Sequence, residues 1–356
     1  MLNVGQDFLS LKSRFYGILQ GKDIYQFTLQ NECMSVDITN LGCSIAAIYT
    51  PGRNGIQKNI VAGFDDLKSY ESNRDYFGCV LGRYANRIAG GCFFLEGKEI
   101  NVSVNDGINH LHGGFEGFNK KIWNVGPVKQ MDEQVYVEFE YLSKDGEEGY
   151  PGNLHVKVKY LLNNKNQLFI EYRAYTDKAT PVSLSNHSYF NLSGFENPLI
   201  TEHGLQINAM SYTEKNKFNV PTGNILPVSD SPLDFRKSKT IGDHINCFQA
   251  DNGFDHNFIL KDHDLGEIVL AAQLKDPESG RTLKVYTDRQ GVQLYTANFW
   301  DGTILGQQGQ LYQKHGAAAL ETQAYPDSPN HPTFPDTILN PGQHYFSTTI
   351  YEFGIE

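Results

Sequence analysis

Apolar and polar residues alternate with a period of two along much of the chain, and this pattern most constrains the fold. The clearest segments are 34–38, 135–141, 155–160, 168–172, 283–287 and 292–296. Alternation places one face of a strand on a core and leaves the other face to water or to a second layer. Turn-forming pairs separate the segments: Glu96-Gly97, Asp145-Gly146, Asn163-Asn164, Asn252-Gly253 and Gln290-Gly291. The pattern predicts an all-β chain of antiparallel strands.

Helical patterns are scarce, and the best of them, residues 65–75, is short. No repeat of fixed period indicates a propeller or a solenoid, and no linker rich in Pro, Gly or Ser divides the chain. The 34 glycines and 22 phenylalanines fit short strands joined by tight turns around an aromatic core. We therefore expect residues 1–356 to form one large single-domain antiparallel β-sandwich with few short helices.

The charge balance argues against nucleic acids and anionic membranes as partners. The formal net charge is −11, and the 30 Lys and Arg form no long run. Both kinds of partner require clustered positive charge. No apolar stretch approaches the roughly 20 residues that are needed to span a bilayer.

The cysteines and the first residues indicate the compartment. Five cysteines are scattered without a CxxC pair, which favours reduced thiols over a disulfide framework. Residues 1–7 show no basic region followed by an apolar block, so the pattern of a signal peptide is missing there. We expect a cytoplasmic protein.

A carboxylate near the C-terminus is the first candidate for chemistry. The apolar run 317–320 predicts a buried strand that leads into Glu321, and Pro326, Pro329 and Pro332 prevent further ladder pairing. We therefore expect Glu321 at the exit of a strand, where a rigid backbone fixes it and the following loop can shape a pocket. The alternative is a glutamate at the edge of a sheet in water.

A second group of candidates lies between residues 82 and 114. The guanidinium of Arg87, next to Asn86, offers a planar fork of donors for carboxylates or sugar hydroxyls, although it could equally form a structural ion pair. His110 and His112 lie two positions apart and would share one face of an extended segment. With Glu116 they resemble half of a cupin metal motif, but no convincing second half follows.

A third group contains side chains that can exchange or share protons. His187 lies among polar neighbours in the segment SLSNHSYFNLSG, and an imidazole with a pKa near 6.5 can hold or yield a proton at neutral pH. The alternative is a structural histidine. Asp255 follows the turn Asn252-Gly253, and Gln293 lies in a predicted strand. Motifs such as GxSxG, the P-loop and HExxH are missing, which favours acid–base chemistry without a cofactor.

Seven motifs occur in order between Gly82 and Tyr345: GRYANRIAGG, NHLHGG, DGEEGYPGNL, TPVSLSNHSYFNLSG, LDFRKSKTIG, GFDHNFIL and LETQAYPDSPNHPTFPDTILNPGQHY. Together they resemble the aldose 1-epimerase (galactose mutarotase) family. The resemblance implies a galactose mutarotase-like supersandwich and an isomerase of carbohydrate metabolism. Such an enzyme interconverts the α and β anomers of free aldohexoses such as galactose and glucose. The first dozen residues carry no family motif, and Gln343 stands where the family often has Glu.

The resemblance also assigns roles to residues by position. Glu321 matches the catalytic base and His187 the catalytic acid. The sugar-binding positions are matched by Asn86, Arg87, His112, Asp255 and Gln293. The resemblance implies no cofactor and no metal.

Three alternatives stay open at this point. One is a sugar-binding module without turnover, and another is a metalloenzyme that uses His110 and His112. The third is a hexose-phosphate epimerase, although no cluster of Arg and Lys near the motifs would hold a phosphate. The preferred aldose and the oligomeric state are not encoded in any pattern that we can interpret.

Overall fold

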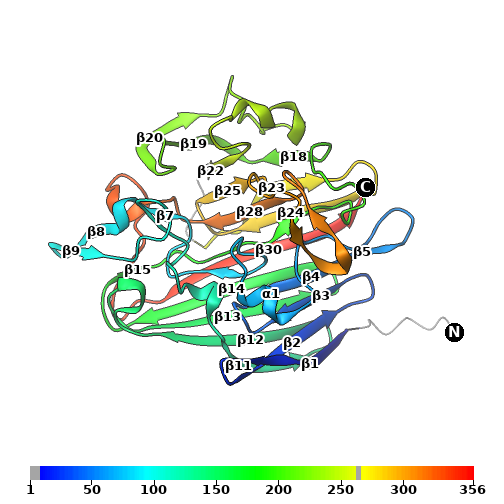
Figure 1. Cartoon of the computed structure of the whole chain (residues 1–356), viewed down its shortest axis with the longest axis horizontal. Coiled ribbons are helices and arrows are strands. Elements are labelled where there is room, and N and C mark those ends of the chain that lie inside the picture. The colour runs from blue at the N-terminus through cyan, green and yellow to red at the C-terminus, as the bar shows by residue number, and fades with distance from the viewer. Residues whose placement is uncertain (1–8, 262–265) are drawn as a thin grey trace.

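The computed structural model describes residues 9–261 and 266–356, and its regular structure is almost entirely antiparallel β (Figure 1). The predictions for residues 1–7, and for most of the first dozen residues, fall outside this range. Within it, no helix combines the length and the apolar character that a bilayer crossing requires.

Three large sheets carry most of the strands. The first is ordered β1-β2-β3-β4-β5 and comprises β1 (Ser10–Leu19), β2 (Lys22–Gln30), β3 (Ser35–Thr39), β4 (Ile45–Pro51) and β5 (Gln57–Asn59). The second, ordered β11-β12-β13-β14-β30-β24-β23-β18-β21, comprises β11 (Asn124–Gln130), β12 (Gln134–Ser143), β13 (Leu154–Asn163), β14 (Gln167–Thr176), β30 (Tyr345–Ile355), β24 (Arg281–Thr287), β23 (Val269–Lys275), β18 (Gly204–Ile207) and β21 (Lys239–Thr240). The third, ordered β17-β28-β25-β22-β19-β20, comprises β17 (Tyr189–Phe190), β28 (Ala318–Gln323), β25 (Gly291–Tyr295), β22 (Asp255–Leu260), β19 (Ala209–Lys215) and β20 (Pro221–Pro227).

Short elements connect these sheets. The two-stranded pairs are β6 (Val80–Leu81) with β16 (Ser185–Asn186), β7 (Arg87–Ile88) with β10 (His110–Leu111), β8 (Cys92–Leu95) with β9 (Lys98–Asn101), β15 (Thr180–Pro181) with β29 (Ile338–Leu339), and β26 (Ile304–Leu305) with β27 (Leu311–Tyr312). The α-helix α1 covers Leu67–Glu71, and single 3₁₀ turns occupy Ala89–Gly91, Phe118–Lys120, Glu147–Gly149, Ile241–Asp243, Ile245–Cys247, Gln307–Gly309 and Ser328–Asn330.

Each alternating segment falls within a strand to within one residue, although several of the strands are longer than the segment, and this confirms the all-β prediction. The helix expected over 65–75 is shorter than predicted. It begins after Asp66, whose side chain caps the helix by accepting the Ser69 N–H, and it ends at Glu71. The next residue, Ser72, leaves the helical region with φ −88° and ψ 2°, and the Asn73 N–H closes a tighter turn by donating to the Tyr70 carbonyl at 3.2 Å.

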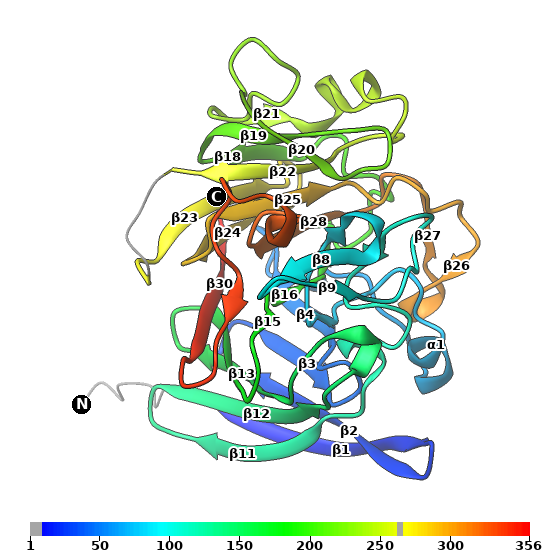
Figure 2. The same cartoon turned by 90° about the vertical axis from the view of Figure 1, so that its left-hand side faces the viewer.

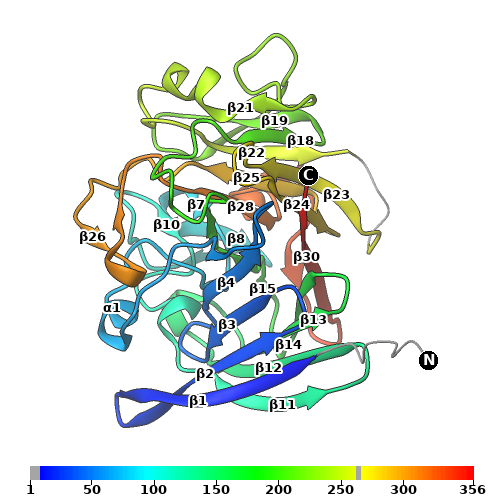
Figure 3. The ribbon, with the colours of Figure 1, turned by 90° about the vertical axis from the view of Figure 1, so that its right-hand side faces the viewer.

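The three sheets share a core. Buried residues of β3, β13 and β28, such as Ile38, Val158 and Leu320, belong to the same apolar cluster. Figures 2 and 3 show β11 and β12 beside β1 and β2 at one end of the molecule, with β19 and β20 at the other. The layers follow from alternation, because each strand turns its apolar side chains toward this cluster. The prediction of one domain over 1–356 stays a prediction.

The six-stranded sheet has a second buried face, which is polar around Glu321 and apolar around Ala319. In β28, Ala318 and Leu320 belong to the shared core. Glu321 is the next residue after Leu320, and because side chains alternate along a strand, it projects to the opposite face. The register places Glu321 opposite Gln293 of β25. Glu321 is the fourth residue of β28, and the strand continues to Gln323, so the expected position at the strand exit was wrong by two residues. The alternative of a solvated edge position also fails, because Glu321 is 2 % exposed and β28 lies between β17 and β25.

Candidate active site

A polar cavity of about 240 Å³ lies over this second face of the six-stranded sheet. Strands β22, β25 and β28 form its floor, and the chain around residues 74–87 and 106–112 forms its walls. The lining residues are Arg74, Asp75, Tyr76, Asn86, Arg87, Asp106, Leu111, His112, His187, Tyr189, Asn219, Asp255, Tyr295, Phe299 and Glu321.

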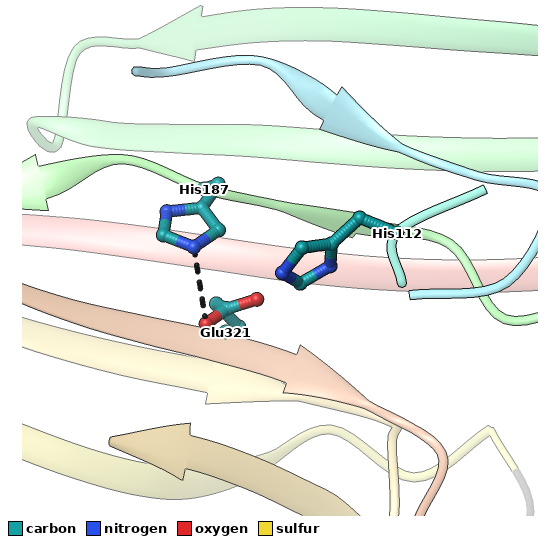
Figure 4. Close-up of side chains that lie close together, drawn as sticks. All are labelled: His112, His187 and Glu321. Carbon is teal, nitrogen blue, oxygen red and sulfur yellow. Dashed lines mark ion pairs between the residues drawn. The ribbon is translucent and has the colours of Figure 1, made fainter. Parts of the chain in front are cut away.

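Glu321 and His187 face each other in this cavity (Figure 4). The Nε2 atom of His187 lies 3.5 Å from Oε1 of Glu321, and both side chains are almost fully buried. Backbone hydrogen bonds fix His187 in the connection between β16 and β17: its N–H donates to the Cys79 carbonyl, and its own carbonyl accepts the Gly78 N–H, each at 2.9 Å. Nδ1 of His187 and Oε2 of Glu321 find no hydrogen-bond partner on another residue within the described chain.

Burial shifts the pKa values of both groups in the direction that favours the neutral side chain. It lowers the pKa of His187 to about 4. It raises the pKa of Glu321 well above its usual value, the Asp255 carboxylate adds to this increase, and Arg87 opposes it. These directions follow because a charged group loses its hydration in a buried site. The neutral forms of both side chains are therefore favoured when the cavity is empty.

A chain of alternating charges forms one wall of the cavity. Arg87 Nε donates to Asp106 Oδ2 at 2.7 Å, and Arg87 Nη1 lies 3.8 Å from Asp255 Oδ2. Lys215, the last residue of β19, donates through Nζ to the Asp255 carbonyl at 2.7 Å. Although burial opposes it, the positive charges of Lys215 and Arg87 lower the pKa of Asp255, which therefore stays ionised. Arg87 is thus both an ion-pair partner and a cavity residue.

Gln293 supports the same carboxylate from the neighbouring strand. Its Nε2 donates to Asp255 Oδ1 at 2.5 Å, and its Oε1 is buried without a partner in the described chain. Gln293 does not line the main cavity. It lines a smaller polar cavity next to it, together with Asn86, Arg87 and Asp255.

Asn86 and His112 both have a left-handed backbone conformation, with φ of 68° and 52°, and two hydrogen bonds join them. The His112 N–H donates to the Asn86 carbonyl, and the Asn86 N–H donates to His112 Nδ1, both at 3.1 Å. Nδ1 is thus an acceptor, and the proton of the neutral ring sits on Nε2. Burial, together with His187 and Arg87, lowers the pKa of His112 well below its usual value, so the ring stays neutral. His112 can therefore donate one hydrogen bond from Nε2.

Three potential metal-ligand atoms lie within 4.8 Å of one another: a ring nitrogen of His112, a ring nitrogen of His187 and a carboxyl oxygen of Glu321. A histidine that binds a metal normally donates its second ring N–H to an acceptor. His112 instead accepts a backbone N–H at Nδ1, so ligation through Nε2 would break this hydrogen bond or require an imidazolate. The residues present do not fit a metal centre.

His110 lies apart from His112, contrary to the expectation of one shared face, because the left-handed conformation of His112 ends the extended segment. Ring atom Nδ1 of His110 lies 2.6 Å from the Ser103 carbonyl oxygen, and its Nε2 lies 2.7 Å from the Tyr150 hydroxyl. Both nitrogens are thus engaged in structural contacts, and His110 is not part of the cavity lining.

The structure brings six of the seven predicted site residues to one cavity and places Gln293 beside it. Sequence reasoning did not single out the cavity residues Asp106 and Tyr76. Asp106 lies in the turn Asp106-Gly107, and only its ion pair with Arg87 reveals its place. Tyr76 follows the helical pattern by one residue, and no signal in the sequence marks it.

Comparison with known proteins gives consistent matches over most of the chain. The family model described as aldose 1-epimerase matches residues 25–352. The galactose mutarotase of Homo sapiens is 43% identical over 335 residues, which cover 94% of this chain and 95% of that protein. The aldose 1-epimerase of Escherichia coli K12 is 36% identical over 342 residues, covering 94% and 96%. The crystal structure of galactose 1-epimerase from Lactobacillus acidophilus superposes with a TM-score of 0.86 at 27% identity, covering 98% of this chain and 99% of that chain.

Proposed function

This chain belongs to the aldose 1-epimerase family, and from that premise we propose that Glu321 and His187 interconvert the α and β anomers of a free aldose by acid–base catalysis. The family identifies the protein as an isomerase that acts on carbohydrates. The substrates that we propose are free aldohexoses such as galactose and glucose. The observation that carries the assignment is the 3.5 Å separation of His187 Nε2 and Glu321 Oε1 in one cavity.

In the proposed mechanism, the Glu321 carboxylate takes the proton from the anomeric hydroxyl O1. The C1–O1 bond becomes a carbonyl while the bond from C1 to the ring oxygen O5 breaks, and His187 donates its proton to O5. Rotation about C1–C2 presents the other carbonyl face. The ring then closes when O5 attacks C1, with His187 taking back the O5 proton and Glu321 returning a proton to O1. No electrons and no groups are exchanged with a cofactor.

The geometry suits this reaction because O1 and O5 are both bonded to C1. An acid and a base that serve these two atoms must therefore lie within a few ångströms of each other, as the two side chains do. Each positioned acid or base is typically worth about 10²–10⁴-fold in rate. The reaction already proceeds slowly in water, so two such groups are sufficient.

For ring opening, His187 and Glu321 must together hold one titratable proton. Burial favours the form with neutral His187 and protonated Glu321, whereas ring opening starts from imidazolium and carboxylate. The two forms differ only in which partner carries the proton. Arg87 favours the ionised carboxylate. The rate should fall at acid pH, where the pair takes a second proton, and at alkaline pH, where it loses its only proton.

The remaining cavity residues would hold the sugar. Sugar hydroxyls both donate and accept hydrogen bonds, so a mixed set of partners suits them. His112 and Arg87 supply donors, Asp255 supplies an acceptor, and Asn86 can supply either. Gln293 would act by fixing the Asp255 carboxylate.

Two alternatives fit the cavity less well. A phosphate ester would enter a space lined by four carboxylates (Asp75, Asp106, Asp255, Glu321) and only two guanidinium groups (Arg74, Arg87), which disfavours a dianion. A binding module without turnover would not require the buried, unpaired carboxyl oxygen of Glu321, which costs stability.

Polarimetry tests the proposal. Freshly dissolved α-galactose and α-glucose should reach anomeric equilibrium faster with the protein present, and chelator should leave the rate unchanged. A sugar phosphate should compete poorly. Binding of galactose without acceleration would support the binding module and refute the proposed turnover.

A further inference from the structure

The orientation of the His187 imidazole is not fixed by a hydrogen bond from Nδ1 to another residue of the described chain. A catalytic histidine usually makes a hydrogen bond with its second ring nitrogen, and that bond fixes its tautomer and rotation. His187 Nδ1 has no partner on another residue in the described chain. Packing against neighbouring rings must therefore fix the plane of the imidazole.

Tyr76 supplies one of four rings around His187, the others being His112, Tyr189 and Tyr295. Its ring is stacked on the imidazole, with centroids 6.0 Å apart and an angle of 26° between the planes. Tyr189 contacts the imidazole at 4.7 Å and 42°. The Tyr76 ring also meets the edge of His112, at 4.7 Å and 61°. Tyr76 thus contacts both imidazoles of the cavity.

The backbone at Tyr76 is held in an unfavourable conformation. Its φ is 60°, a left-handed value that costs energy for any residue with a Cβ. The flanking chain is fixed on both sides: Asn73 and Phe77 exchange hydrogen bonds of 3.0 and 3.2 Å, and the Cys79 N–H donates to the Tyr76 carbonyl at 3.3 Å. A strained residue that its surroundings hold in place, at the wall of a cavity, is typical of a functional position.

We propose that Tyr76 is a positioning residue, whose ring fixes the His187 imidazole opposite Glu321 and keeps water away from the pair. The proposal rests on the proposed function of that pair. The ring rather than the hydroxyl performs this role, because the contacts with both histidines are ring contacts. Tyr76 supplies ring packing where Nδ1 of His187 has no hydrogen-bond partner on another residue of the described chain.

Two substitutions separate the ring from the backbone strain. Tyr76→Phe keeps the ring and should keep kcat within about threefold. Tyr76→Gly removes the ring and relieves the left-handed strain, because glycine adopts positive φ freely. We expect kcat of Tyr76→Gly to fall about 10–100-fold, with a smaller change in KM, since small misplacements of a reacting group cost up to about 10²-fold. If the glycine variant does not fold, Tyr76→Asn, which also tolerates positive φ, replaces it.

Phe195 provides a matched control. It is also an aromatic residue with a positive φ of 62°, and its ring packs on Tyr312 at 5.1 Å rather than on a cavity residue. Phe195→Gly should leave kcat and its pH dependence unchanged. A loss of kcat in Phe195→Gly equal to that in Tyr76→Gly would show a general effect of lost packing and would overturn the proposal.

The pH dependence gives a readout that a merely structural role would not move. Water that enters beside His187 should raise its pKa from about 4 toward 6.5. The acid limb of the kcat profile should then move to higher pH in Tyr76→Gly and stay in place in Tyr76→Phe. A wild-type profile and kcat in Tyr76→Gly, or an equal loss in Tyr76→Phe, would overturn the proposal.

NMR titration of the His187 ring separates this proposal from the proposed function. The wild-type ring should titrate near pH 4, and the ring in Tyr76→Gly should titrate at higher pH, whether or not the protein catalyses mutarotation. If the wild type fails to accelerate mutarotation, the proposed function fails, and the titration alone decides the role of Tyr76. An unchanged titration in Tyr76→Gly refutes that role.

Discussion

Replacement of Glu321 by glutamine isolates the proposed base with the least change in shape. The side chain is buried, its Oε1 lies 3.5 Å from His187 Nε2, and its Oε2 has no partner in the described chain. The amide occupies nearly the same volume but cannot take a proton from O1. A base worth about 10²–10⁴-fold corresponds to about 2.7–5.4 kcal/mol in the activation barrier, at 1.36 kcal/mol for each factor of ten. We expect Glu321→Gln to lose activity by that factor.

The same variant should become more stable relative to the wild type as pH rises. Burial raises the folded-state pKa of Glu321, so the folded protein holds a proton that the unfolded chain releases above about pH 4.5. This group therefore contributes stability at low pH that is lost with increasing pH. Glutamine does not titrate. The variant should match the wild type near pH 4.5 and exceed it increasingly toward pH 8, by about 1.36 kcal/mol per pH unit up to the folded-state pKa.

The assay is polarimetry of freshly dissolved α-galactose in dilute buffer, with the rate in the absence of protein subtracted. Urea unfolding at pH 4.5 and 8 measures stability. Glu138→Gln is a control outside the cavity, because Glu138 on β12 is partly buried and pairs with Lys157 on β13. Activity of Glu321→Gln within tenfold of the wild type would refute its role as base. Lower stability than the wild type at pH 8 would refute the argument from burial.

Four further outcomes follow from the site. His187→Asn should lower kcat about 10²–10⁴-fold, and combining it with Glu321→Gln should add little, because the two groups act as a unit. The ¹⁵N chemical shifts of His112 should show a neutral ring protonated at Nε2 from pH 6 to 8; protonation at Nδ1 would contradict the Asn86 hydrogen bond. Lys215→Met should raise KM for galactose about tenfold through loss of its contacts with Asp255, whereas Lys159→Met, which breaks an ion pair on β13, should not. Urea unfolding should show that the free energy of unfolding falls as pH is lowered from 6.5 toward 4. Burial holds the pKa values of His187 and His203 near 4, so the unfolded chain takes up protons that the folded protein excludes. Each of the two groups contributes about 1.36 kcal/mol per pH unit, and a flat profile would contradict this.

Alternation in the sequence was sufficient to predict six strands (β3, β12, β13, β14, β24 and β25) but not the end of β28, which the apolar run 317–320 predicted. In β28 the polar residues Thr322 and Gln323 look like the start of a loop, yet both are buried. Thr322 hydrogen-bonds to Thr349 of β30, and Gln323 Nε2 lies 3.5 Å from Asn257 Oδ1 on β22. These partners come from strands far away in the sequence, so no local pattern marks the strand as continuing.

Site residues that lie in a recognisable sequence motif could be predicted. Those whose position depends on a left-handed backbone conformation could not. The resemblance supplied Glu321 and His187 by position, and the structure adds their distance. The separation of His110 from His112 depends on a left-handed residue, and a periodic pattern gives no sign of it. Tyr76 was not predicted for the same reason, since its place at the cavity follows from a positive φ in a loop.

The placement of Leu320 and Glu321 as neighbours on one strand ties the proposed catalysis to the register of β28. Inserting or deleting one residue at the start of β28 would turn the carboxylate into the apolar cluster and bring a leucine to the cavity. A single substitution in β28 keeps this register, whereas a change in the length of the strand shifts it. Attempts to alter which sugar is accepted are therefore better directed at the loops that carry Asp106 and Phe299, whose lengths are free of this constraint.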